Sequence, residues 1–184
     1  MVSSAQDVVA VIESDPGAMR ILRAAAGLGL PDWWIGAGFV RGRVWDAISN
    51  LPPSPDRDVD LAYFDPRHTD PAEEARAEAQ ASAVLPGTPW EIRNQARMHL
   101  RNGDEPYAST LEAIARWPET ATCVAVTIRD DAVRLVACHG LDDLVNMVVR
   151  PSPAFADEAG RAKIHRRLES KGWLTRWPGL RLEV

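Results

Sequence analysis

Hydrophobic and polar positions follow helical periods over much of the chain. Val8–Gly29 predicts two short helices, the second of them capped by Asp15, with Pro16 at its first position and its end at Gly27 or Gly29. Apolar residues spaced four apart predict a helix over 39–49, and the cap Asp70 begins another over 70–85. We expect further helices at 94–100, 109–117, 140–149 and 158–173.

Short apolar segments between these helices predict strands at 32–36, 58–65 and 89–93. A hairpin over 122–140, turning at Asp130-Asp131, places Val124, Val126 and Ile128 opposite Ala137, Leu135 and Val133. The same register sets Cys123 across from Cys138, where a disulfide is geometrically conceivable. The fold class is therefore α/β (α+β), with a short mixed sheet and helices packed on one face.

Composition narrows the class of protein. The chain has 184 residues, of which 46% are hydrophobic and 26% charged, and its net charge is −5. We expect one domain over 1–184, made of an N-terminal helical segment (1–29), a core (30–150) and a C-terminal helical segment (151–184). The negative net charge argues against strong sequence-independent binding of nucleic acid.

Two features indicate a cytoplasmic protein. The sequence has no apolar stretch long enough to cross a membrane, and its first residues lack the basic region of a secretory signal. In a reducing compartment the chain's two cysteines are expected to be free thiols.

A glycine turn, Gly36-Ala37-Gly38, stands where a predicted strand meets a predicted helix. Glycine lets the backbone approach a ligand closely, and the free N–H groups of a helix N-terminus attract anions. This turn is a candidate phosphate site. Taken alone, glycines at the end of a strand are better explained as an ordinary turn.

Asp58 and Asp60 lie on one face of the next strand, opposite Val59, Leu61 and Tyr63. Neighbouring carboxylates repel each other unless a cation lies between them, and the oxygen pair suits Mg²⁺. The alternative is a solvated edge strand. Together with a backbone anion site, however, the pair matches the needs of phosphoryl chemistry with two metal ions.

The segment "GAGFVRGRVWD", followed by "DRDVDL", resembles the nucleotidyltransferase superfold of DNA polymerase beta and of the CCA-adding and poly(A) polymerases. Over about residues 30–180 the chain is similar to a bacterial family of small, poorly characterised nucleotidyltransferase-like proteins. The segments "WEIRNQARMH", "WPETATCVAV", "GLDDLVNMVVRP" and "WPGL" carry this second likeness.

The resemblance implies a role for each matching residue. Asp58, Asp60 and Glu91 would hold Mg²⁺, as two ions, and Glu91 would also accept the proton of the attacking hydroxyl. Arg41 would contact phosphate or pair with a site carboxylate. The triphosphate of an NTP would lie against the turn formed by Gly36, Ala37 and Gly38.

The chain also departs from the family pattern. Its turn reads Gly-Ala-Gly, a proline-rich loop (50–57) lengthens the gap to Asp58, and the third acid is Glu91 rather than aspartate. The helical RNA-binding domains of CCA-adding enzymes are missing, which argues against tRNA maturation.

Polar residues after Glu91 are candidates for the acceptor side: Asn94, Gln95, Arg97 and His99. The alternative for this group is a structural polar cluster beside the sheet. Residues 166–171 are expected to form a solvated helix face. Tryptophans near the turn either stack on a nucleobase or, as we favour, pack in the core.

The sequence thus predicts a Mg²⁺-dependent nucleotidyltransferase that moves a nucleoside monophosphate from an NTP to an acceptor hydroxyl and releases pyrophosphate. The acceptor stays open between a protein side chain, an antibiotic-like small molecule and an RNA end. The alternative is a catalytically inactive nucleotide-binding or protein-interaction module on the same fold.

Overall fold

The computed structural model describes residues 2–184. Its first half contains α1 (Ala5–Glu13), α2 (Pro16–Gly27), β1 (Trp34–Gly36), α3 (Gly38–Ile48), β2 (Val59–Tyr63), α4 (Pro71–Val84), β3 (Trp90–Asn94) and α5 (Gln95–Asn102). The second half contains α6 (Thr110–Ile114), η1 (Thr120–Thr122), β4 (Val124–Arg129), β5 (Ala132–Ala137), α7 (Asp142–Val145), β6 (Val148–Val149), η2 (Pro153–Phe155), α8 (Glu158–Lys171), α9 (Trp173–Arg176) and β7 (Arg181–Leu182).

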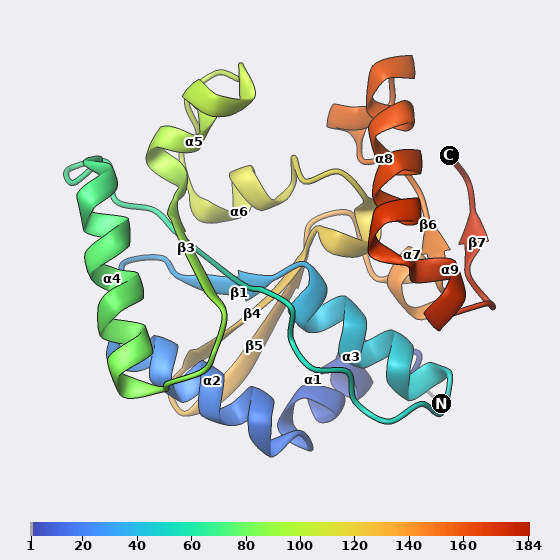
Figure 1. The fold of residues 1–184 in the computed structure, drawn as a ribbon, viewed down its shortest axis with the longest axis horizontal. Coiled ribbons are helices and arrows are strands. Elements are labelled where there is room, and N and C mark those ends of the chain that lie inside the picture. Colours follow the sequence, from blue (N-terminus) through green and yellow to red (C-terminus); the bar gives the residue numbers. More distant parts are fainter. Residues whose placement is uncertain (1) are drawn as a thin grey trace.

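A five-stranded sheet in the order β3-β2-β1-β4-β5 lies at the centre of the molecule (Figure 1). Strands β2 and β3 are parallel, whereas the other neighbouring pairs are antiparallel. The connection through α4 explains the parallel pair, because a parallel crossover needs a long segment, usually a helix. The predicted mixed α/β fold is confirmed.

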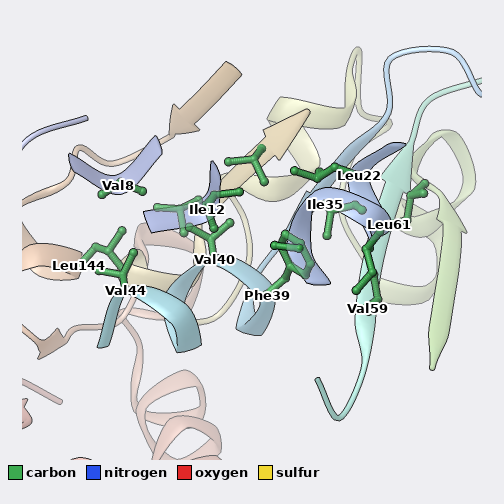
Figure 2. Packing of buried hydrophobic residues seen from close by; sticks show 14 of the residues in the cluster. Val8, Ile12, Leu22, Ile35, Phe39, Val40, Val44, Val59, Leu61 and Leu144 are labelled. Atoms are coloured by element: carbon green, nitrogen blue, oxygen red, sulfur yellow. The ribbon is translucent and has the colours of Figure 1, made fainter. Parts of the chain in front are cut away.

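The main hydrophobic core fills one face of this sheet. Apolar residues of α1, α2, α3 and β2 meet there, among them Val8, Leu22, Phe39 and Leu61 (Figure 2). The opposite face carries a smaller cluster in which α6 contributes Ile114 against Ala62 and Ala125. The helices therefore lie mainly on one face, as predicted, and α6 covers part of the other.

Alternation along β2 follows the prediction. Val59, Leu61 and Tyr63 point into the main core, whereas Ala62 belongs to the smaller cluster on the other face. Asp60 shares the face of Ala62 because side chains two residues apart in a strand point the same way. The pattern therefore leaves the carboxylate outside the main core.

The hairpin β4–β5 has the predicted register, with Val126 opposite Leu135. Asp130 and Asp131 both take positive φ, at 51° and 57°, as a two-residue hairpin turn requires. The amide of Cys138 donates to the carbonyl of Cys123 at 2.9 Å, and both cysteines are free thiols.

The prediction of a helix over 140–149 is wrong for its second half. Helix α7 ends at Val145, and Met147 then takes a positive φ of 54°, which breaks the helical path. Val148 and Val149 instead form β6, paired in parallel with β7. Because this partner lies at the far end of the chain, local periodicity gives no sign of it.

Helix α8 is held to the preceding segment by a tight backbone contact. A Cβ on Gly160 would lie 2.4 Å from the Phe155 carbonyl oxygen, so only glycine fits. The Gly160 amide also donates to the capping carboxylate of Asp157 at 2.8 Å. These contacts fix the start of a helix that runs to Lys171.

Replacing this glycine tests that anchor. Gly160→Ala should lower the free energy of unfolding by about 2 kcal/mol or more, because backbone atoms must move to admit the methyl group. Gly27→Ala is the matched control, since a Cβ there meets nothing within 4 Å. Urea unfolding should show the control unchanged or slightly stabilised. An unchanged Gly160→Ala variant would contradict the packing described here.

Candidate active site

Three carboxylates from two neighbouring strands line one cleft. Asp58 directly precedes β2, Asp60 lies within it, and Glu91 lies opposite Asp60 in the parallel register of β2 and β3. Register partners on adjacent strands point to the same face. All three side chains line a cleft of about 600 Å³.

Asp60 carries the electrostatic cost of this arrangement. Its pKa is raised to about 6, first by burial and then by the charges of Asp58 and Glu91. Lys171 and Arg167 act in the opposite direction and lower this pKa. The charged form of Asp60 is therefore disfavoured at its own position, mainly because the side chain has lost water. A cation bound directly beside the carboxylate would offset this cost.

The carboxylate oxygens of Asp58, Asp60 and Glu91 suit a hard divalent cation, but the three side chains do not form a complete coordination shell. Within residues 2–184, no three His, Cys, Asp or Glu side chains are grouped closely enough to hold a metal ion as they stand. Glu91 is exposed, and the Lys171 ammonium lies 3.2 Å from an Asp58 carboxylate oxygen. Mg²⁺ commonly takes one or two carboxylates and completes its shell with water and phosphate oxygens, so Asp58 and Asp60 suffice as protein ligands.

The turn before α3 is strained at its central residue. Ala37 has φ 50° and ψ −122°, a conformation that glycine adopts far more easily than alanine. Ala37 and Gly38 line the cleft, and Gly38 begins α3 there. Gly36 does not line it, because this glycine is covered by Trp117: a Cβ would lie 2.7 Å from the indole.

Arg41 lies one turn into α3 and faces the carboxylates. Its side chain is buried, and its Nε has no hydrogen-bond partner among residues 2–184. The guanidinium lies 3.9 Å from the ring centroid of Trp173, and burial lowers its pKa to about 10. A buried cation with an unsatisfied hydrogen-bond donor in the first turn of a helix is suited to bind an anion.

The residues predicted for the acceptor side mostly lie elsewhere. Asn94 caps α5 and donates to the carbonyls of Asp65 and His68, Arg97 forms two hydrogen bonds with Glu74, and His99 packs on Tyr107. Of the four predicted residues, Gln95 lines the cleft and these three do not.

Asn94, Arg97 and His99 are instead structural links beside the sheet, which was the alternative for this group. The neighbouring residues that do line the cleft are Arg93, Gln95, Met98, Arg101 and Asn102.

The expectation of a solvated face at 166–171 is also wrong for two residues. Arg167 and Lys171 line the cleft together with Lys163, one turn apart along α8. Arg167 donates to the buried Glu119 at 2.8 Å, which ties α8 to the core. The spacing of these three basic residues was the available signal, but the sequence did not show which element α8 would face.

Most of the tryptophans near the turn are core residues, as favoured, and Trp34 is only partly buried against the smaller cluster. Trp33, Trp45 and Trp90 are buried in the main core. The tryptophans that line the cleft are Trp117 and Trp173, which the sequence had not singled out.

The profile of a nucleotidyltransferase family matches residues 23–182. That range contains the glycine turn, the three carboxylates and α8. The chain belongs to this nucleotidyltransferase family. Its mixed sheet and the cleft beside it are thus the framework of a nucleotidyltransferase core.

Solved structures agree with this assignment. A structure described as revealing a CCA-adding enzyme head domain is 30% identical, with a TM-score of 0.86, over 100% of this chain and 97% of that one. A CCA-adding enzyme in complex with ATP is 18% identical, with a TM-score of 0.57, over 96% of this chain and 43% of that one. The Thermotoga maritima CCA-adding enzyme complexed with tRNA is 17% identical, with a TM-score of 0.56, over 96% of this chain and 42% of that one.

The nucleotidyltransferase chain therefore spans under half the length of the two full enzymes. At their level of identity these enzymes support the fold alone. No curated protein sequence matches the chain. Within residues 2–184, no helix is both long and apolar enough to cross a membrane.

Strain at the turn yields one prediction. Ala37→Gly should raise the free energy of unfolding by about 0.5–2 kcal/mol, because relief of strain outweighs the entropy that glycine loses on folding. Ala47→Gly, the same change at an exposed position within α3, should instead lower it by about 1 kcal/mol. Urea denaturation of both variants measures the two signs. A loss of stability in both would refute the strain.

The pKa of Asp60 yields a second prediction. The pKa of Asp60 in the folded protein is about 6, above the ordinary 3.8. The folded state therefore loses stability as the pH rises from about 4 to 6, because Asp60 ionises more easily in the unfolded chain. Without divalent cations, Asp60→Asn should gain up to about 3 kcal/mol at pH 8 and little at pH 4. Asp131→Asn at the exposed hairpin turn is the control. Urea unfolding curves between pH 4 and pH 8 measure this difference. An equal change in the free energy of unfolding at pH 4 and pH 8 would contradict the raised pKa of Asp60.

Proposed function

We propose that this protein is a metal-dependent nucleotidyltransferase that moves a nucleoside monophosphate from an NTP to an acceptor hydroxyl and releases pyrophosphate. The observation that carries the proposal is the convergence of Asp58, Asp60 and Glu91 in one cleft with the start of α3. Membership in the nucleotidyltransferase family supports the general chemistry.

The phosphate side is formed by the turn and by α3. Gly38 stands at the N-terminus of α3 in the cleft, where a free backbone N–H favours an anion. The Ala37 N–H already donates to the Val124 carbonyl at 3.2 Å. The unsatisfied Nε of Arg41 supplies a further hydrogen-bond donor. Lys163, Arg167 and Lys171 of α8 add positive charge to the cleft, which favours a triphosphate over a neutral ligand. The similar CCA-adding enzyme solved with ATP is consistent with an NTP here.

The carboxylates would act at the reacting phosphate. Asp58 and Asp60 would hold Mg²⁺, which when bound neutralises charge that develops on the phosphoryl oxygens. Glu91 is exposed in the same cleft and would accept the proton as the acceptor oxygen forms its bond to the α-phosphorus. The bond from that phosphorus to the bridging oxygen breaks, and pyrophosphate leaves beside Arg41.

A non-catalytic nucleotide-binding module is the second candidate. It is favoured by the Lys171–Asp58 ion pair, which occupies a carboxylate oxygen that a metal ion would need. It is also favoured by the lack of a ready three-carboxylate cluster in residues 2–184. Binding of an NTP independent of Mg²⁺ would be the sign of this function.

Mg²⁺-dependent binding separates the two candidates. Calorimetry should show that wild-type protein binds NTP at least about tenfold more tightly with Mg²⁺ than with EDTA, as expected when charge on both partners must be neutralised. Asp58→Asn and Asp60→Asn should each lose this enhancement. Asp56→Asn is the matched control, because Asp56 pairs with Arg43 on the loop before β2. Enhancement that survives both substitutions would defeat the enzyme proposal.

Transfer itself is tested with α-labelled NTP in a cell extract containing the purified protein. Label that enters protein, RNA or small molecules in the wild-type sample, and fails to do so with Asp60→Asn, would identify the acceptor class. Equal labelling with the wild-type and the Asp60→Asn protein would exclude transfer at these carboxylates.

A further inference from the structure

Trp117 lines the cleft from a segment that the proposed mechanism does not use. It follows α6 and precedes η1, and its side chain is only partly buried. In the described residues it makes no ring–ring or cation–π contact, unlike Trp45, Trp173 and Trp177. An indole at the wall of a charged cleft is thus left with an unpaired ring.

Gly36 holds this ring in place. A Cβ at position 36 would lie 2.7 Å from Cζ3 and 2.9 Å from Cη2 of Trp117, so the indole rests directly on the backbone of β1. Beneath it are Ile114 and Ala125 of the smaller apolar cluster. A strand glycine normally costs stability, and here its absent side chain makes room for the aromatic ring.

The position of Trp117 relative to the phosphate site suggests what the ring holds. Two residues further on, Glu119 accepts a hydrogen bond from Arg167 of α8 at 2.8 Å. The same helix ends with Lys171, 3.2 Å from Asp58. One wall of the cleft therefore runs from the carboxylates along the cations of α8 to the segment that carries the indole.

We propose that Trp117 is a stacking platform for the nucleobase of the bound NTP, an inference that rests on the proposed function. With the phosphates at Arg41 and the carboxylates, a nucleoside extending along α8 brings a planar ring to the indole. Stacking recognises the flat face that every base has, rather than its hydrogen-bonding edge. The site should therefore accept all four bases with similar affinity.

Binding of four NTPs and of inorganic tripolyphosphate, all with Mg²⁺, tests the assignment. Trp117→Ala should weaken ATP, GTP, CTP and UTP by about 5- to 150-fold, the effect of losing one base stack, and leave tripolyphosphate unchanged. Trp117→Phe should restore most of the affinity. Circular dichroism and thermal unfolding of each variant check that the fold is kept.

Fluorescence gives an independent readout. Nucleotide should quench part of the indole emission in wild type and in the control Trp34→Phe, whose partly exposed indole does not line the cleft. Trp117→Phe should show less quenching, with Trp173 left as the remaining indole in the cleft.

Three results would overturn the inference. They are NTP affinities unchanged in Trp117→Ala, an equal loss for tripolyphosphate, or a loss confined to the rate of transfer, which would assign the ring to the acceptor. If wild-type protein binds neither NTP nor tripolyphosphate, the proposed function itself fails.

Discussion

The site depends on one ion pair, between the carboxylate before β2 and the last residue of α8. Asp58 and Lys171 lie 113 positions apart in the sequence and are joined at 3.2 Å. Lys171 of this pair lowers the pKa of Asp60, whereas burial and the charges of Asp58 and Glu91 raise it, to about 6 in all. The basic residue that α8 brings to the cleft thus reduces the repulsion among the carboxylates.

The same helix makes the C-terminal segment part of the site. Trp173, directly after the α8 C-cap, covers the guanidinium of Arg41 at 3.9 Å, and Arg176 donates to the buried Asp46 of α3 at 2.9 Å. Arg41 is thereby desolvated, and its donors are directed by packing rather than by an ion pair. A preorganised cation of this kind loses little entropy when an anion binds.

Much of the fold was predictable because the signals are local. The helix caps Asp15 and Asp70, the alternation in β2 and the register of the hairpin each depend on neighbours in sequence, and each is confirmed. The strand β6 escaped prediction because its partner β7 is distant in sequence. Asn94, Arg97 and His99 were misassigned because polarity marks a residue as needing partners without saying whether those partners are ligands or protein.

By itself the sequence determined the resemblance to nucleotidyltransferases and placed Asp58 and Asp60 on one face, since strand alternation is a property of the backbone. That the chain belongs to the family rests on the profile match. The tertiary structure decided that Glu91 shares the cleft and that Lys163, Arg167 and Lys171 face it. It also decided that Gly36 packs against the indole of Trp117 and does not line the cleft. Those outcomes depend on which distant elements pack together, and that choice is made by burial of apolar surface across the whole chain, which no local pattern encodes.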